Sequence, residues 1–132
     1  MPGYSTEDIS KVRFERAEEC LEAARQNMEL QDFKTAANRS YYAVFHSMRA
    51  VLAFDKFDSK KHSGVISEFR RRYIKTGLLP EELSPIITKL FNVRGSSDYE
   101  DFFVISKEEV TEQYQNAVKF VEAIKAYLKR RE

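Results

Sequence analysis

Arg39 and His46 form a pair that could act together on a phosphate group. In an α-helix a separation of seven residues corresponds to a rise of roughly 10 Å and an offset of about 20° around the axis, so both side chains would share one stripe. Because helical side chains lean toward the N-terminus, Arg39 leans away from His46 and a phosphate could sit between them. An imidazole can transfer a proton and a guanidinium can stabilise phosphate charge. The pair therefore fits phosphodiester cleavage that needs no metal.

Cleavage of this kind needs two proton transfers. If a two-fold axis duplicated the stripe, one histidine could remove the proton from a ribose 2′-hydroxyl while a second protonated the leaving 5′-oxygen. The same Arg39 and His46 are also compatible with a satisfied buried pair or with a surface coincidence. Composition does not decide between these readings.

The segment that carries the pair, residues 33–54, is predicted to be a helix with almost no plainly polar side. One face has the apolar spacing of a bundle core. The opposite face holds Arg39 and His46 among small residues, which let another helix approach closely. Another helix of the same chain could pack there, but the first and last helices already suffice to cover the core face. We therefore expect a homodimer with this helix near its two-fold axis. The small residues of that face are Ala36, Ala43, Ala50 and Ala53.

The remaining elements follow from caps, breakers and helical periodicity. A first helix should begin near Ser5 or Thr6 and run to about residue 30, with Asp32 capping the next one. A short helix should span 65–74 and end at Gly77, and another should have Pro80 in its first turn. Residues 95–104 lack a helical period and are predicted to be a loop. A last helix should follow the capping-box pattern of Ser106 and Glu109.

Composition and charge restrict the class of protein. The 132 residues fit one domain, 1–132, and the pattern predicts an all-α, up-and-down bundle of four to five helices. With 22 basic and 21 acidic residues the chain has no global attraction to nucleic acid or membrane. A single cysteine, Cys20, favours a reducing compartment, and no stretch is long and apolar enough to span a bilayer. We expect a cytoplasmic protein with no membrane partner.

The sequence around the pair is similar to that of a known family. Residues 38–52 read Asn-Arg-Ser-Tyr-Tyr-Ala-Val-Phe-His-Ser-Met-Arg-Ala-Val-Leu. This string resembles the signature helix of HEPN domains, the higher eukaryote and prokaryote nucleotide-binding family. Looser agreement continues at His62, at Arg94 and at the Asp98-Tyr99 pair, so that the resemblance covers roughly residues 5 to 130.

The resemblance implies both a fold and an activity. HEPN domains are four-to-five-helix bundles that dimerise, and they are commonly encoded beside a minimal nucleotidyltransferase as a toxin and antitoxin pair. Many are metal-independent endoribonucleases that use the motif's arginine and histidine in a cleft between protomers. By this resemblance Arg39 would bind the scissile phosphate and His46 would transfer protons, with RNA as substrate and no cofactor or metal. Other members are noncatalytic modules that bind a nucleotide or a partner, and this is the alternative function.

Further residues are candidates for substrate contact. Tyr42 borders the expected cleft and could stack a base. His62 is either a phosphate contact or second proton donor, or a loop residue near a helix start. Arg94 is spaced to pair with Asp98 at a helix end, or it contacts substrate. The expected substrate-binding set is Ser40, Tyr42, Arg49, His62 and Arg94; Ser40 stands where active HEPN members often carry Asn, Asp or His.

Overall fold

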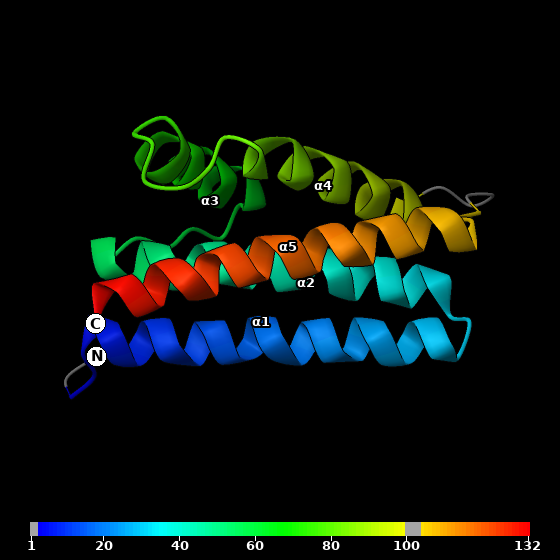
Figure 1. Ribbon diagram of the computed structural model, residues 1–132, viewed down its shortest axis with the longest axis horizontal. Helices are drawn as coiled ribbons and strands as arrows, with labels where there is room; N and C mark the ends of the chain where they lie inside the picture. Colours follow the sequence, from blue (N-terminus) through cyan, green and yellow to red (C-terminus); the bar gives the residue numbers. More distant parts are fainter. Residues whose placement is uncertain (1–2, 100–103) are drawn as a thin grey trace.

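The computed structural model describes residues 3–99 and 104–132 and contains only helices and turns within those ranges. The helices run up and down the bundle (Figure 1), which confirms the all-α prediction. Both described ends of the chain lie at the same end of the bundle. The elements are α1 (Thr6–Glu29), α2 (Phe33–Leu52), a 3₁₀ turn (Ala53–Asp55), α3 (His62–Phe69), a π-helical turn (Arg70–Ile74), α4 (Leu83–Tyr99) and α5 (Lys107–Arg131).

Three predicted helix starts are confirmed by their caps. The Ser5 hydroxyl accepts a hydrogen bond from the Asp8 amide, and the Asp8 carboxylate accepts one from the Ser5 amide. Asp32 accepts from the Thr35 amide at the start of α2, and Ser106 caps α5. Each cap satisfies an amide that would otherwise lack a helical partner. Caps that the sequence displays therefore define where α1, α2 and α5 begin.

The boundaries of α4 differ from the prediction at both ends. The helix begins at Leu83, beyond Pro80, and places Pro85 in its first turn, where the missing amide hydrogen costs no helical bond. At the other end α4 continues to Tyr99, so the loop predicted from residue 95 was wrong over 95–99. The pairing of Arg94 with Asp98, 3.5 Å apart, supports this last stretch. Residues 100–103 of the predicted loop lie outside the described part of the chain.

The predicted short helix over 65–74 is observed as α3 followed by the π-helical turn. Tyr73 in this turn donates a hydrogen bond to the Val51 carbonyl or to the Asp55 carboxylate, at 3.1 and 2.8 Å. Gly77 then adopts a φ of +78°, as expected for a glycine that ends a helix. The turn thus joins α3 to the end of α2.

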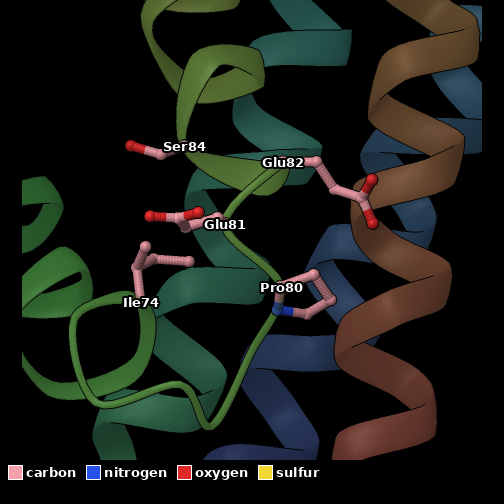
Figure 2. A pocket seen from close by; sticks show the side chains of 5 residues that line it. All are labelled: Ile74, Pro80, Glu81, Glu82 and Ser84. Atoms are coloured by element: carbon pink, nitrogen blue, oxygen red, sulfur yellow. The ribbon is translucent and has the colours of Figure 1, made fainter.

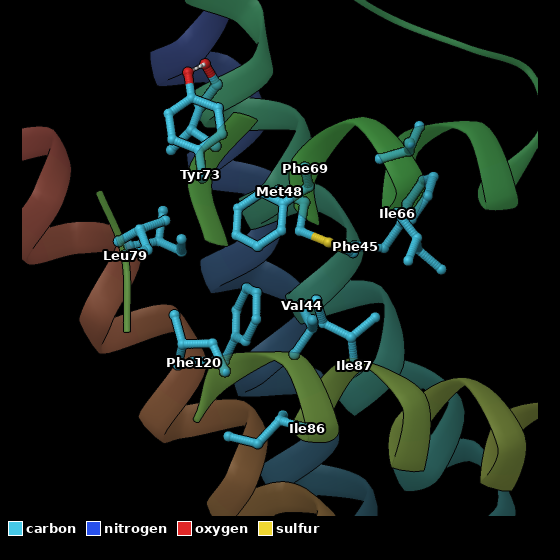
Figure 3. Packing of buried hydrophobic residues seen from close by; sticks show 14 of the residues in the cluster. Val44, Phe45, Met48, Ile66, Phe69, Tyr73, Leu79, Ile86, Ile87 and Phe120 are labelled. Atoms are coloured by element: carbon cyan, nitrogen blue, oxygen red, sulfur yellow. Dashed lines mark hydrogen bonds between the residues drawn. The ribbon is translucent and has the colours of Figure 1, made fainter. Parts of the chain in front are cut away.

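The hydrophobic core lies between α2, α3, α4 and α5. Met48 and Val44 of α2 are fully buried and face Phe69 of α3 and Phe120 of α5 (Figure 3), and the rings of Phe69 and Phe120 are 5.7 Å apart. Ile87 of α4 closes the cluster. This arrangement uses the apolar face of α2 that the helical period predicts.

The alanine face of α2 packs against α1 within the same chain. Ala36, Ala43 and Ala50 have no exposed surface, and Ala43 contacts Cys20 of α1. On the facing side Ala17 of α1 is also fully buried. The small side chains allow the two helices to approach closely along their length. The expectation that this alanine face meets a second copy of the protein was therefore wrong, because α1 already occupies it.

In the described part of the chain, no helix has the length and hydropathy needed to cross a membrane.

Candidate functional site

Most of the predicted site residues gather around Tyr42 on the flank of α2 that remains partly exposed. The Arg39 guanidinium carbon lies 5.2 Å from the centre of the Tyr42 ring, and that of Arg94 lies 5.9 Å from it. The rings of His46 and His62 have their centres 5.9 and 5.7 Å from that of Tyr42. Residues from α2, α3 and α4 thus form one cluster, which we call the Tyr42 cluster: Arg39, Tyr42, His46, His62 and Arg94.

Arg39 is held at the α1 side of the cluster. Its Nε and Nη2 donate hydrogen bonds to the Oδ1 of Asn38, at 3.0 and 2.7 Å. Its Nη1 lies 3.7 Å from the Sγ of Cys20. Burial raises the pKa of the Cys20 thiol, so the sulfur stays neutral and does not neutralise the guanidinium. Arg39 therefore keeps its full positive charge beside Tyr42.

His46 is held as a neutral ring in a defined tautomer. Its Nδ1 lies 3.2 Å from the Nη1 of Arg49. A guanidinium nitrogen can only donate, so Nδ1 must accept and the ring proton must be on Nε2. Burial and the nearby charges of Arg49, Arg16 and Arg39 lower the pKa of His46 to about 4. The imidazole is therefore uncharged at neutral pH.

Arg49 is held by the loop that precedes α3. Its Nε and Nη2 donate to the two carboxylate oxygens of Asp58, at 3.2 and 3.0 Å. Arg13 of α1 donates to the Arg49 carbonyl oxygen and also reaches Asp58. Only Nη1 of Arg49 is directed at His46. Arg49 therefore positions His46, and its charge is already shared with a carboxylate.

His62 is the first residue of α3 and packs against α2. Its ring centre is 4.2 Å from that of Phe45. Its Nδ1 lies 2.9 Å from the Tyr41 hydroxyl and 3.3 Å from the Nη2 of Arg94. Burial and the charge of Arg94 lower the pKa of His62. The helix therefore begins at His62 itself, earlier than the predicted start at residue 65, and the side chain enters the Tyr42 cluster.

Arg94 is a buried cation surrounded by aromatic rings. Its guanidinium carbon lies 4.8 Å from the centre of the Tyr41 ring and 5.6 Å from that of Phe91. Its Nη1 pairs with Asp98, and its Nε has no hydrogen-bond partner among the described residues. The aromatic faces and Asp98 together stabilise a charge that would otherwise be costly to bury. The ion pair with Asp98 that the spacing predicted is confirmed.

Ser40 does not belong to the cluster. Its side chain is fully buried, and its Oγ has no hydrogen-bond partner among the described residues. At one residue beyond Arg39 the helical rotation of 100° turns it into the bundle. The expectation that Ser40 contacts a substrate was therefore wrong.

Three residues that the sequence reasoning missed support the cluster. Asn38 fixes Arg39, Asp58 fixes Arg49, and Phe45 packs against His62. Asn38 could have been noticed because it adjoins Arg39 in the sequence. Asp58 gives no periodic signal, since a loop brings it back to α2.

Neither of two surface hollows contains a residue of the Tyr42 cluster. One of about 660 Å³ is lined by two carboxylates, those of Glu81 and Glu82 (Figure 2), which disfavour a phosphate. Another, of about 510 Å³, lies between α3 and α4 and shares Phe91 with the surroundings of Arg94. Among the described residues no three His, Cys, Asp or Glu side chains are grouped to hold a metal ion.

Comparison with known proteins identifies relatives over most of the chain. A protein of Thermotoga maritima named "UPF0332 protein" is 34% identical over 109 residues, which cover 83% of each chain. Two proteins of Methanocaldococcus jannaschii, named "Putative toxin MJ0142" and "Putative toxin MJ0605", are 37% and 38% identical over 116 and 115 residues. These matches cover 86% and 87% of this chain and 78% and 85% of the relatives.

The family model described as "HEPN domain" matches residues 10–129, which include every residue of the Tyr42 cluster. Together with the relatives above, this match shows that the chain belongs to the HEPN domain family.

Proposed function

We propose that this protein is a cytoplasmic, metal-independent endoribonuclease that acts as the toxin of a toxin–antitoxin pair. The observation that carries the proposal is the convergence of Arg39 and His46 with a second arginine and a second histidine around one tyrosine. RNA cleavage through the 2′-hydroxyl needs groups that transfer protons and groups that stabilise the phosphate charge, and imidazoles and guanidiniums can supply them. The names of the two Methanocaldococcus jannaschii relatives agree with a toxin role.

The proposed reaction is an internal displacement at phosphorus. The ribose 2′-oxygen forms a bond to phosphorus, its proton passes to a histidine, and the bond from phosphorus to the 5′-oxygen breaks. A second histidine gives a proton to that leaving oxygen, so the products are a 2′,3′-cyclic phosphate and a 5′-hydroxyl. Arg39 would hold the scissile phosphate and stabilise its extra negative charge. His46 would serve in proton transfer.

The proposal includes a dimer that forms the cleft. Because α1 covers the alanine face of α2, the dimer contact would use the exposed flank that bears Arg39, Tyr42 and His46. A two-fold contact of that flank would bring two copies of the Tyr42 cluster to one cleft. Light scattering on the purified protein would test this, and a monomer at all accessible concentrations would contradict it.

Cleavage assays test the activity directly. The purified wild-type protein should cut RNA in the presence of EDTA, and Arg39→Ala should reduce the rate by about 10²-fold or more because the phosphate loses its cation. Arg25→Ala is the matched control, because Arg25 is an exposed arginine of α1 whose ion-pair partners among the described residues are Glu22 and Glu29. Equal rates for wild type and Arg39→Ala would contradict the proposal.

A noncatalytic binding module is the second candidate. It is favoured by the contact between Arg49 and His46, which occupies the only unprotonated ring nitrogen. In that case the protein would bind a nucleotide or a nucleotidyltransferase antitoxin without forming a product. Stable co-purification with such an enzyme, together with intact RNA at saturating protein concentration, would favour this function.

A further inference from the structure

The two histidines of the chain converge although they come from different elements. His46 lies near the end of α2 and His62 begins α3, and the sequence contains no other histidine. Both rings contact the same two neighbours: their centres lie 5.9 and 5.7 Å from that of Tyr42, and 5.6 and 4.2 Å from that of Phe45. Both side chains are partly exposed. A ligand that reaches Tyr42 can therefore meet both imidazoles of one chain.

The two imidazoles have the same orientation relative to their arginines. Nδ1 of His46 faces Arg49, and Nδ1 of His62 faces Arg94. Since guanidinium groups only donate, both Nδ1 atoms accept, and each neutral ring carries its proton on Nε2. Both rings therefore direct an N–H group away from the arginine that holds them.

The two environments differ in whether they tolerate a charged ring. The Nδ1 contact of His46 is a guanidinium, which cannot accept a hydrogen bond from an imidazolium. His62 also has the Tyr41 hydroxyl at 2.9 Å, and a hydroxyl can turn from donor to acceptor when Nδ1 gains a proton. Burial raises the pKa of Tyr41 to about 12, so this hydroxyl is neutral. Burial and the charge of Arg94 lower the pKa of His62, but the Tyr41 hydroxyl offers an acceptor for a proton on its Nδ1. The Nδ1 contact of His46 offers no such acceptor.

On the basis of the proposed ribonuclease function, we infer that His62 is the general acid that acts with His46 of the same protomer. His46 takes the 2′-hydroxyl proton on its unprotonated nitrogen once the phosphate draws Nη1 of Arg49 away. Because the guanidinium is a rigid plane, this movement also releases its Nε and Nη2 from Asp58. The 2′-oxygen bonds to phosphorus, the bond to the 5′-oxygen breaks, and the His62 imidazolium gives its Nε2 proton to that oxygen. The step leaves a 5′-hydroxyl, a neutral His62 and a protonated His46, so its protons balance.

A change of leaving group tests this assignment. We would compare a dinucleotide RNA substrate with its analogue in which sulfur replaces the bridging 5′-oxygen, because a thiolate leaves without protonation. His62→Ala should cut the ordinary substrate about 10²-fold more slowly than wild type. It should cut the sulfur analogue within about tenfold of the wild-type rate. His46→Ala should be slow on both substrates because it lacks the base.

Controls separate the possible outcomes. Ser67→Ala, at an exposed position later in α3, should leave both rates unchanged. His62→Gln keeps a polar side chain against Phe45 and serves if His62→Ala does not fold. A His62 variant as active as wild type on ordinary RNA, or equally slow on both substrates, overturns the inference. A wild-type protein that cleaves neither substrate instead overturns the proposed function itself.

Mixing the two variants tests whether both histidines act within one protomer. Equimolar His46→Ala and His62→Ala proteins should stay as slow as either variant alone, since neither chain has both groups. Recovery of at least a quarter of the wild-type rate would show that the acid and base come from different protomers and would overturn the same-protomer assignment.

Discussion

Two sides of α2 show how one helix combines packing with chemistry. On the side that faces α1, Ala36, Ala43 and Ala50 are fully buried and carry no polar group. On the adjoining flank, Arg39 and His46 are partly exposed and engaged with charged or aromatic neighbours. The alanine side brings α1 close enough for Cys20 and Arg13 to contact Arg39 and Arg49. Close packing on one side therefore positions the cations on the other.

The largest expected difference between the two sides is in activity. His46→Gln on the polar flank should lower RNA cleavage by about 10³-fold, because it removes a proton-transfer group. Its free energy of unfolding should change by less than about 1 kcal/mol, since the ring is partly exposed. Single-turnover rates and urea denaturation would measure both quantities. Gln115→Ala on the exposed face of α5 is the control. A His46→Gln protein that cleaves RNA as fast as wild type would contradict the assignment of catalysis to the polar flank.

The alanine side should respond in stability. Ala43→Leu forces a larger side chain between α2 and Cys20 of α1, and we expect the free energy of unfolding to fall by about 3 kcal/mol. Ala126→Leu, at an exposed position of α5, should change it by no more than about 0.5 kcal/mol. Chemical denaturation of both variants would measure the contrast. Equal stability for the two would mean that the contact between α1 and α2 is not tightly packed.

The polar flank should make folding sensitive to acid. The folded pKa of His46 is about 4 against an ordinary value of 6.5, so between these pH values the unfolded chain binds a proton that the folded chain does not. Stability should therefore fall as the pH decreases through this window, by about 1 to 2 kcal/mol after allowance for the partial exposure of the ring. Above pH 6.5 this contribution is fully present. Denaturation midpoints at pH 7 and 5 would measure the slope, and His46→Gln should make it smaller; an unchanged slope would contradict this origin.

The smallest effect on stability is expected at the contact between the polar flank of α2 and the loop that precedes α3. Asp58→Asn removes the carboxylate that holds Arg49, but the Asp58 side chain is 45% exposed, so the loss should be about 0.5 to 1 kcal/mol. The loss should shrink in high salt because solvent ions screen exposed charges. Denaturation at two salt concentrations would check this. Asp8→Asn weakens the cap of α1 far from Arg49, and it is the comparison variant for a loss of stability confined to α1.

The sequence predicted most elements because their signals are local. The caps Ser5, Asp32 and Ser106 each act within a few residues, and the apolar periods of α2 and α5 require no knowledge of neighbours. The end of α4 was missed because residues 95–99 have no apolar period, while the ion pair of Arg94 with Asp98 supports the helix there. Local patterns alone therefore could not locate that boundary.

For the candidate site, residue types and spacing along α2 were sufficient to select Arg39, Tyr42 and His46, because one helix places them by its fixed rotation. The contacts of each face of α2 depend instead on how the helices pack together. The fold buries Ser40 and packs the alanines against α1. It also brings Asp58, His62 and Arg94 to the flank from three other segments. The physical reason is that helical rotation depends on the chain itself, whereas the position of one helix against another depends on the summed packing of all the side chains between them.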